Sequence, residues 1–319
     1  MSLLFKRSGI LTTLQDLGRY GYQRFGINPT GAMDTTAARI ANLLVSNDEN
    51  EPVIEMHFPA PEIIFQRDVI ASIAGAEMSA TLNGDTLDNW STFFGREGDT
   101  LRFEGKKLGN RAYLAIHGGL RVAKWLGSSS TNLAARAGGF HGRGIRSGDI
   151  LDTIDTALDN RLLGRRAAQS LIPLYRPFPT VRVIRGAEFD LMDEQSKIKF
   201  ETLDFAISND SNRMGFRLAG DALDLVRKCE LLSSAVSYGT IQLLPNGQMI
   251  VLMAAHQTTG GYPRIAHVIS RDLPLVGQLG PGDRVGFHVV DIAHAEDLAV
   301  EFEREMSMFR VAAFGGKRW

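Results

Sequence analysis

Short apolar or alternating segments separated by tight turns make up most of the 319-residue chain. Such segments run over 69–74, 112–116, 181–185 and 249–253, and each is bounded by turn-forming residues. Four turns carry a glycine followed directly by an aspartate, at Gly84, Gly98, Gly148 and Gly282, and an apolar residue follows each aspartate within two positions. A glycine that adopts a positive φ suits a turn that feeds a strand. The pattern predicts a mainly β protein built from barrels or sandwiches, not a βαβ sheet.

Two segments carry a helical pattern instead. Asp34 can cap a helix whose buried face would contain Ala37, Ile40, Ala41, Leu44 and Val45. Near the C-terminus, Asp291 or His294 can open a second helix, with one face made of Ala295, Leu298, Ala299, Phe302 and Met306. Both stripes are typical of helix faces that pack against a core.

The segment 155–175 differs in character from what surrounds it. It contains Arg165 and Arg166, and Pro173, Pro177 and Pro179 follow before a new apolar run begins at 181. Such a segment is typical of a connector between domains. The sequence therefore predicts two β domains, residues 1–170 and residues 171–319, the second ending in the C-terminal helix.

Charge and cysteine content exclude several classes of protein. The chain has 35 Lys+Arg against 36 Asp+Glu, which argues against a dedicated nucleic-acid surface. Of those cations 27 are arginines, which favours recognition of carboxylate or phosphate groups. The single Cys229 excludes an internal disulfide and a cysteine-based zinc site. The N-terminus lacks a signal-peptide pattern and no run of 18 apolar residues occurs, so a cytoplasmic protein away from the membrane is expected.

Glycine is clustered in three regions of the chain. Of 33 glycines, 5 lie in residues 9–31, 8 in residues 118–148 and 8 in residues 239–286. These regions also contain polar side chains, but they contain no P-loop, no G-x-S-x-G motif and no close pair of histidines. No metal site built by the protein is therefore expected.

The polar residues of these regions allow two interpretations. Asp16 and Asp34 can be carboxylates of a site, or they can cap turns and helices. Arg19 and Arg213 can contact a ligand, or they can form pairs within the protein. Gly260 and Gly261 permit close approach of a ligand, but a tight turn would also use them. The residues alone therefore predict a β-rich protein with polar glycine loops and leave its reaction open.

Taken together, these segments resemble the biotin-dependent carboxyltransferase-like family. This family includes the C subunit of bacterial 5-oxoprolinase, the carboxyltransferase region of urea carboxylase and the second allophanate-hydrolase-like subunit. The resemblance covers about residues 1–290. The matching stretches occur in family order at residues 9–19, 31–34, 38–45, 126–131, 138–143, 211–215 and 257–263.

The resemblance implies two cyclophilin-like β-barrel domains in a protein that is one subunit of an enzyme complex. The implied activity is the ATP-dependent opening of the lactam of 5-oxo-L-proline to L-glutamate. The implied partners are the A and B subunits of 5-oxoprolinase, of which the B subunit is kinase-inhibitor-like. The implied cofactor is ATP, with Mg²⁺ bound through the complex, and no biotin is expected to be attached to this chain. The isolated chain is expected to be inactive or weakly active.

The resemblance also implies which residues form the site. Asp16, Asp34 and Arg213 are the catalytic candidates. The candidates for substrate binding are Gln15, Gln257, Thr258, Gly260, Gly261 and Tyr262. The candidates for anion binding are Ser128, Thr131 and Arg143. This sequence has Ala255 where many family members carry an aspartate, so any role of that aspartate is missing here.

Two other functions remain open at this stage. The first is biotin-dependent carboxyl transfer to a urea-like amide. None of the 8 lysines is flanked by methionine, so a biotin carrier would have to be supplied elsewhere. The second is a non-catalytic role, in which the chain antagonises a histidine-kinase inhibitor by binding it.

Overall fold

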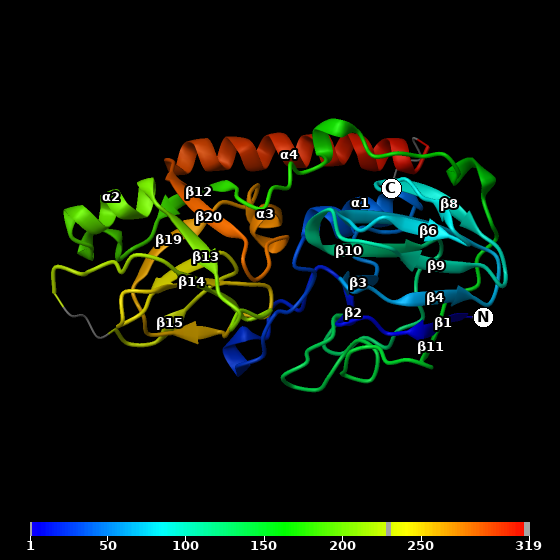
Figure 1. Ribbon diagram of the computed structural model, residues 1–319, viewed down its shortest axis with the longest axis horizontal. Helices are drawn as coiled ribbons and strands as arrows, with labels where there is room; N and C mark the ends of the chain where they lie inside the picture. Colours follow the sequence, from blue (N-terminus) through cyan, green and yellow to red (C-terminus); the bar gives the residue numbers. More distant parts are fainter. Residues whose placement is uncertain (1, 228–230, 316–319) are drawn as a thin grey trace. The chain divides into compact units, whose positions relative to one another are not determined.

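The computed structural model describes residues 2–227 and 231–315, and Cys229 lies outside these ranges. The described chain is mainly β with few helices, as the sequence predicts (Figure 1). The α-helices are α1 (Thr35–Leu44), α2 (Glu194–Thr202), α3 (Leu273–Gly277) and α4 (Ile292–Ala313). Four short 3₁₀ turns are η1 (Gln23–Phe25), η2 (Asn160–Leu162), η3 (Gln169–Leu171) and η4 (Phe189–Leu191).

The chain divides into two compact units, and each unit contains segments that are distant in sequence. The first comprises residues 1–19, 30–173 and 304–319, and the second comprises residues 20–29 and 174–303. The main division after Pro173 lies close to the predicted boundary at 170. The predicted boundaries differ in two places, because residues 20–29 group with the second unit and the end of the C-terminal helix groups with the first. Within the first unit, Arg310 of α4 pairs with Glu49.

Two antiparallel sheets form the first unit. The six-stranded sheet has the order β11-β1-β4-β9-β6-β7 and the five-stranded sheet the order β2-β3-β10-β5-β8. The strands of the six-stranded sheet are β1 (Ser2–Arg7), β4 (Glu62–Phe65), β6 (Ala80–Leu82), β7 (Asp85–Thr86), β9 (Thr100–Phe103) and β11 (Ile150–Asp152). The strands of the five-stranded sheet are β2 (Thr12–Gln15), β3 (Val53–His57), β5 (Val69–Glu77), β8 (Ser91–Gly95) and β10 (Leu108–Ile116).

Strand β5 shows how the core of the first unit is built. Ala71 and Ile73 belong to the apolar cluster that unites residues of both sheets. The intervening Ser72 points the other way and donates a hydrogen bond to the Ala41 carbonyl of α1 over 2.6 Å. Helix α1 therefore covers the opposite face of the five-stranded sheet (Figure 1). A strand buried on both faces is a nearly continuous apolar run in the sequence, as 69–74 is apart from Ser72.

The second unit contains a closed seven-stranded barrel with the order β12-β19-β16-β17-β14-β13-β20. The barrel is closed by the parallel pairing of β12, its first strand in the sequence, with β20, its last. Its strands are β12 (Thr180–Arg185), β13 (Asp204–Ile207), β14 (Gly215–Ala219), β16 (Thr240–Leu243), β17 (Met249–Leu252), β19 (Arg264–Val268) and β20 (Arg284–Val289). A separate two-stranded sheet pairs β15 (Ser234–Ala235) with β18 (Thr259–Gly260).

The predicted turns and helices are confirmed. The four glycines of the Gly-Asp turns all have a positive φ. Asp34 caps α1 by accepting a hydrogen bond from the Ala37 amide over 2.9 Å. Asp291 accepts one from the His294 amide at the start of α4, and the predicted face of that helix is its buried or half-buried face.

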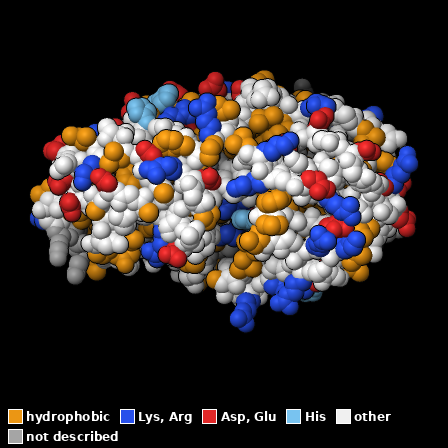
Figure 2. Space-filling view, in the orientation of Figure 1, with side chains coloured by type: hydrophobic (Ala, Val, Ile, Leu, Met, Phe, Trp, Pro, Cys, Tyr) orange, Lys and Arg blue, Asp and Glu red, His pale blue; other side chains and the backbone are white. Residues whose placement is uncertain are grey.

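The surface carries charges of both signs. On the face shown in Figure 2, lysine and arginine side chains are intermixed with aspartate and glutamate side chains. This distribution agrees with the net charge of -1. Among the described residues, no helix is both long enough and apolar enough to cross a membrane.

Candidate functional site

The predicted site residues fall into two groups, one in each unit. The first-unit group contains Gln15, Asp16, Asp34, Ser128, Thr131 and Arg143. The second-unit group contains Arg213, Gln257, Thr258, Gly260, Gly261 and Tyr262. The chemical roles assigned to them stay predictions.

Asp16 lies at the centre of the first-unit group and is 2% exposed. Its Oδ1 accepts hydrogen bonds from the hydroxyls of Ser128 and Ser130 and from the amide of Gly18. Its Oδ2 accepts one from the amide of Ser129 over 2.6 Å. Two hydroxyls and two amides therefore compensate for the loss of water around this buried carboxylate. The arrangement fixes the serine-rich segment 128–130 beside the end of β2.

Arg19 binds the same segment from another side and is 1% exposed. Its Nη2 donates to the carbonyls of Ser130, over 2.9 Å, and Ser128, over 3.4 Å. Its Nε donates to the carbonyl of Trp125, and the guanidinium lies 4.3 Å from the centre of that ring. Burial lowers the pKa of Arg19, while the negative charge of Asp16 raises it. Asp16 therefore accepts hydrogen bonds from donors of this loop, and Arg19 donates hydrogen bonds to its carbonyls.

Two glycines let the next loop pack closely against this segment. A Cβ at Gly138 would lie 2.3 Å from the Ser130 carbonyl oxygen, and one at Gly139 would lie 1.9 Å from Thr131 Oγ1. Both also have a positive φ. No larger residue fits either position without moving the backbone. The glycines of this region are therefore structural requirements of a tightly packed loop.

Gln15 and Thr131 join this loop to β2. Thr131 Oγ1 donates to the Leu14 carbonyl over 3.0 Å. Gln15 is fully buried, and its Nε2 donates to Thr13 Oγ1 over 3.0 Å. Among the described residues, Gln15 Oε1 has no hydrogen-bond partner. A buried amide oxygen without a partner is costly, so this position is a weak point of the packing or a place for a donor from outside.

Arg143, predicted to bind an anion, already has a carboxylate partner. Its Nη1 and Nη2 donate to the two oxygens of Asp149 over 2.6 and 2.9 Å. The hydrogen bonds of this pair lower the pKa of Asp149 and raise the pKa of Arg143. The pair closes the turn that leads into β11. Binding of an external anion by Arg143 would require this pair to open.

Asp34 belongs to a different buried network. Its backbone amide donates to Tyr113 Oη over 2.8 Å, and Tyr113 Oη donates to Glu55 Oε2 over 2.9 Å. The Met33 amide donates to the same carboxylate oxygen over 2.8 Å. Burial, and then the charge of Glu55, raises the pKa of Tyr113 well above its ordinary value. Asp34 is thus a helix cap at the edge of this network, which was one of its two predicted roles.

In the second unit, three loops meet at one end of the barrel. The Ala255 amide donates to the Arg213 carbonyl over 2.8 Å, which fixes the two loops side by side. Asn28 Nδ2 donates to the carbonyls of Ala255 and His256 over 3.1 and 2.6 Å. These bonds explain why residues 20–29 group with the second unit. Arg213 is 8% exposed, so its guanidinium lies largely within the protein.

Amide side chains line the adjoining part of this loop cluster. Gln257 Nε2 donates to Gln242 Oε1 over 3.3 Å, and Gln242 Nε2 donates to the Tyr262 carbonyl over 3.4 Å. Gln242 is fully buried. A Cβ at Gly260 would lie 2.5 Å from Gln242 Nε2, so this glycine lets β18 approach the amide. The structure therefore brings together Gln257, Gly260 and Tyr262.

His256 lies between these contacts and is 4% exposed. Its Nδ1 lies 2.6 Å from the Gln257 carbonyl oxygen. Burial lowers the pKa of its imidazole. An imidazole that stays neutral near pH 7 can donate from one nitrogen and accept at the other.

The sequence interpretation missed three residues of these clusters. Gln242 could have been noticed, because Thr240 and Gln242 are polar at alternate positions of an otherwise apolar strand. Asn28 lies in a glycine-rich segment that was noted, but nothing in its neighbourhood indicates a contact with residues 255 and 256. Glu55 follows an apolar residue in a buried strand, and its partner Tyr113 is distant in sequence.

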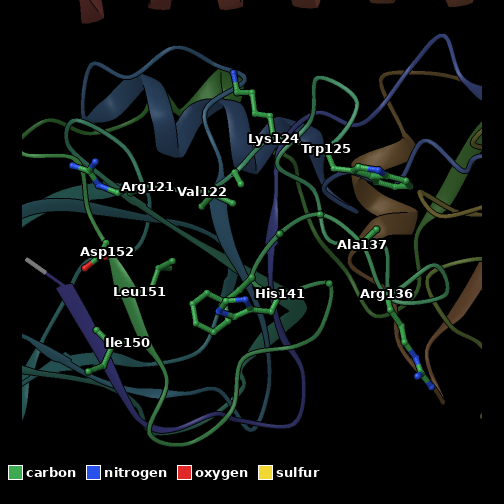
Figure 3. Close-up of a pocket in the computed structure, with 15 residues that line it drawn as sticks. Arg121, Val122, Lys124, Trp125, Arg136, Ala137, His141, Ile150, Leu151 and Asp152 are labelled. Atoms are coloured by element: carbon green, nitrogen blue, oxygen red, sulfur yellow. The ribbon is translucent and has the colours of Figure 1, made fainter.

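The first unit also contains a cavity of about 520 Å³ beside the glycine loop. Figure 3 shows His141 near its centre, with Val122, Ile150 and Leu151 on one side and Trp125 on the other. Its remaining lining residues are Arg121, Ala123, Lys124, Arg136, Ala137, Gly138, Gly139, Phe140, Gly142 and Asp152. No group of three or more histidine, cysteine, aspartate or glutamate side chains suited to a metal ion occurs within residues 2–227 and 231–315.

Comparison with known proteins places the chain among carboxyltransferase domains. A family model described as carboxyltransferase domain, subdomain A and B, matches residues 25–289. The C subunit of 5-oxoprolinase from Haemophilus influenzae is 35% identical over 298 residues, which are 93% of this chain and 94% of that protein. The C subunit of 5-oxoprolinase from Escherichia coli is 36% identical over 281 residues, which are 88% of this chain and 89% of that protein.

A solved structure shares the fold over nearly the whole chain. The urea amidolyase of K. lactis superimposes with a TM-score of 0.90 at 27% identity. The match covers 97% of this chain but only 20% of the urea amidolyase, so the chain corresponds to one part of that larger protein.

Proposed function

The chain belongs to the carboxyltransferase domain family, subdomain A and B, and on that premise we propose that it is the C subunit of an ATP-dependent 5-oxoprolinase. The observation that carries the proposal is the similarity to two proteins named as C subunits of 5-oxoprolinase, at 35% and 36% identity. These matches cover most of both chains, so no large part of either relative lacks a counterpart here. The complex would also contain the A and B subunits, of which the B subunit is kinase-inhibitor-like.

The reaction needs ATP because a lactam carbonyl is a poor electrophile. Its oxygen attacks the γ-phosphorus of ATP, the bond to the β-phosphate oxygen breaks, and ADP leaves. Water then adds to the activated carbon, the C–N bond of the ring breaks, and the nitrogen takes a proton to become the amine. A second water hydrolyses the resulting acyl phosphate to L-glutamate and phosphate. Such a reaction needs cationic groups for the phosphate and polar groups for the small acid.

We assign recognition of 5-oxoproline to the second-unit loop cluster, defined by Asn28, Arg213, Gln242, His256, Gln257 and Tyr262. Donors and acceptors of several kinds come together there. The Gln257 and Gln242 amides already bond to each other, and the Arg213 backbone is bonded to the same loop. A guanidinium suits the carboxylate of the substrate, and an amide suits the lactam. Mg²⁺ enters with the nucleotide, and no biotin is attached to this chain.

The test is reconstitution of the complex. The chain is co-purified with its partner subunits, and release of glutamate and phosphate is followed with 5-oxoproline and ATP. Equal release of both products, absent when any one of the three proteins is omitted, supports the proposal. Phosphate release that does not depend on 5-oxoproline would contradict it.

A second candidate function is carboxyl transfer within a larger complex. It is favoured by the urea amidolyase of Lachancea kluyveri, which is 30% identical over 92% of this chain, although the match covers 17% of that protein. A carrier with carboxybiotin would then have to come from another chain. Discharge of carboxybiotin that depends on this chain and on a urea-like amide would favour this candidate. Binding of the kinase-inhibitor-like partner without either activity would favour the antagonist role.

A further inference from the structure

The cavity beside the glycine loop is separate from the second-unit loop cluster in sequence and in unit. One wall of the cavity is tightly packed, because a Cβ at Gly142 would lie 2.1 Å from the Arg136 carbonyl oxygen and one at Gly138 would lie 2.9 Å from Arg19 Nη2. The loop is thus closely packed from behind and open towards the cavity. A preformed cavity of this size is typical of sites for small molecules.

The charge around the cavity is mainly positive. Arg121, Lys124 and Arg136 line it, against one carboxylate, that of Asp152. All three cations are exposed, and none forms an ion pair within 4 Å among the described residues. In Figure 3 the side chains of Arg121 and Lys124 lie at one edge of the cavity, and Arg136 lies on the opposite side of His141. Long exposed side chains at an edge can turn over a bound anion without a large cost in packing.

The nearby residues predicted to bind an anion already have hydrogen-bond partners within the protein. The Ser128 hydroxyl donates to Asp16, the Thr131 hydroxyl donates to Leu14, and Arg143 is bonded to Asp149. These contacts stabilise the loop behind the cavity. An anion that approaches this region therefore meets the exposed cations first.

The cavity also offers flat apolar surface. Trp125, Phe140 and His141 contribute rings to its lining, and Val122, Ile150 and Leu151 contribute aliphatic groups (Figure 3). Purine bases stack on such rings. A volume of about 520 Å³ is several times larger than a single small ring acid needs, but it suits a nucleotide. Rings and cations in one cavity suit a ligand with both a base and a polyphosphate.

We propose that this cavity binds the nucleoside triphosphate, with Arg121 and Lys124 on the phosphates and the rings of Trp125 and His141 beside the base. The proposal rests on the proposed function for the identity of the nucleotide as ATP. It assigns the nucleotide to the first unit of this chain, which neither the family match nor the relatives' names do.

The test is direct binding of ATP with Mg²⁺ to the full-length chain, measured by isothermal titration calorimetry. Arg121→Ala combined with Lys124→Ala removes charge, and Ala123→Trp fills the cavity without removing charge. The matched controls are Arg96→Ala combined with Lys107→Ala, which removes two exposed cations outside the cavity lining, and Ala134→Trp, which adds an exposed ring elsewhere. Circular dichroism checks that each variant is folded.

We expect one saturable site in the wild-type chain, weakened about tenfold or more by the charge variant and by Ala123→Trp. Both controls should bind as the wild type does, and raising the salt concentration should weaken binding. Absence of saturable binding, or equal binding by all variants, overturns the proposal. If the complex turns over 5-oxoproline although this chain binds no ATP, the nucleotide site is wrong and the 5-oxoprolinase function stands. Cavity-dependent ATP binding without such turnover would support the site and contradict the 5-oxoprolinase function.

Discussion

The hydroxyl of Ser128 donates a hydrogen bond of 2.8 Å to the carboxylate of Asp16, across 112 residues of chain. The same carboxylate accepts from Ser130 and from two backbone amides, so Asp16 organises the loop that forms the rear of the cavity. This relationship gives a predicted catalytic residue a structural role that can be separated from catalysis by experiment.

Asp16→Ala should lower the free energy of unfolding by about 3 kcal/mol, because it leaves two hydroxyls and two amides without their acceptor. Ser128→Ala should lower it by about 1 kcal/mol, because it removes only one donor. Urea denaturation of both variants measures these values. A variant at position 16 with unchanged stability and no turnover in the complex would instead support the catalytic role.

Gly139→Ala and Gly260→Ala should have opposite consequences. Gly139 has a φ of 55°, and a Cβ there would lie 1.9 Å from Thr131 Oγ1, so alanine should cost about 3 kcal/mol of stability. Gly260 has no positive φ, and the three atoms nearest to a Cβ there all belong to the end of the Gln242 side chain. Gly260→Ala should therefore fold normally but displace the Gln242–Gln257 pair and raise the KM for 5-oxoproline.

Gly105→Ala is the control for this pair of variants, because a Cβ there has no neighbour within 4 Å and φ is not positive. It should match the wild type in both stability and turnover. If Gly260→Ala unfolds the protein, position 260 is a structural glycine and gives no evidence for a site.

His256 should make the protein less stable in mild acid. Its folded pKa is lowered by burial, so below its unfolded pKa of about 6.5 the unfolded chain binds the proton more readily. Stability should therefore fall as pH drops from about 7 through 6.5 and become level once the pH is below the lowered folded pKa. His256→Gln should remove this part of the slope, which urea denaturation at a series of pH values will show. A slope identical to that of the wild type would contradict the prediction.

Local features of the fold could be predicted, but the contacts of the site could not. The cap at Asp34 and the Gly-Asp turns depend on residues close in sequence, and the structure confirms both. The sequence could not show that Arg19 would be buried, because its partners are the carbonyls of residues 125, 128 and 130. The sequence also could not show that Arg143 forms an ion pair with Asp149. An arginine near glycines is equally consistent with a bound anion and with a pair inside the protein.

The division of the chain into two units could also be predicted only in part. Proline and charge around 155–175 indicate a boundary, and the division lies after Pro173. The grouping of residues 20–29 with the second unit depends on side-chain contacts such as those of Asn28, which no local pattern indicates. Long-range hydrogen bonds, rather than propensity, decide where such segments belong.

Asn28→Ala should impair turnover more than folding. Its amide donates to the carbonyls of Ala255 and His256 over 3.1 and 2.6 Å, and these residues directly precede Gln257. Loss of these bonds should cost about 1 kcal/mol of stability but loosen the loop that carries Gln257. We expect a raised KM for 5-oxoproline in the reconstituted complex. Gln23→Ala is the control and should leave KM unchanged, because Gln23 lies in the same segment and its side chain accepts a hydrogen bond from the exposed amide of Gly21. Equal kinetic effects of the two variants would show that the segment as a whole, and not the Asn28 amide, positions the loop.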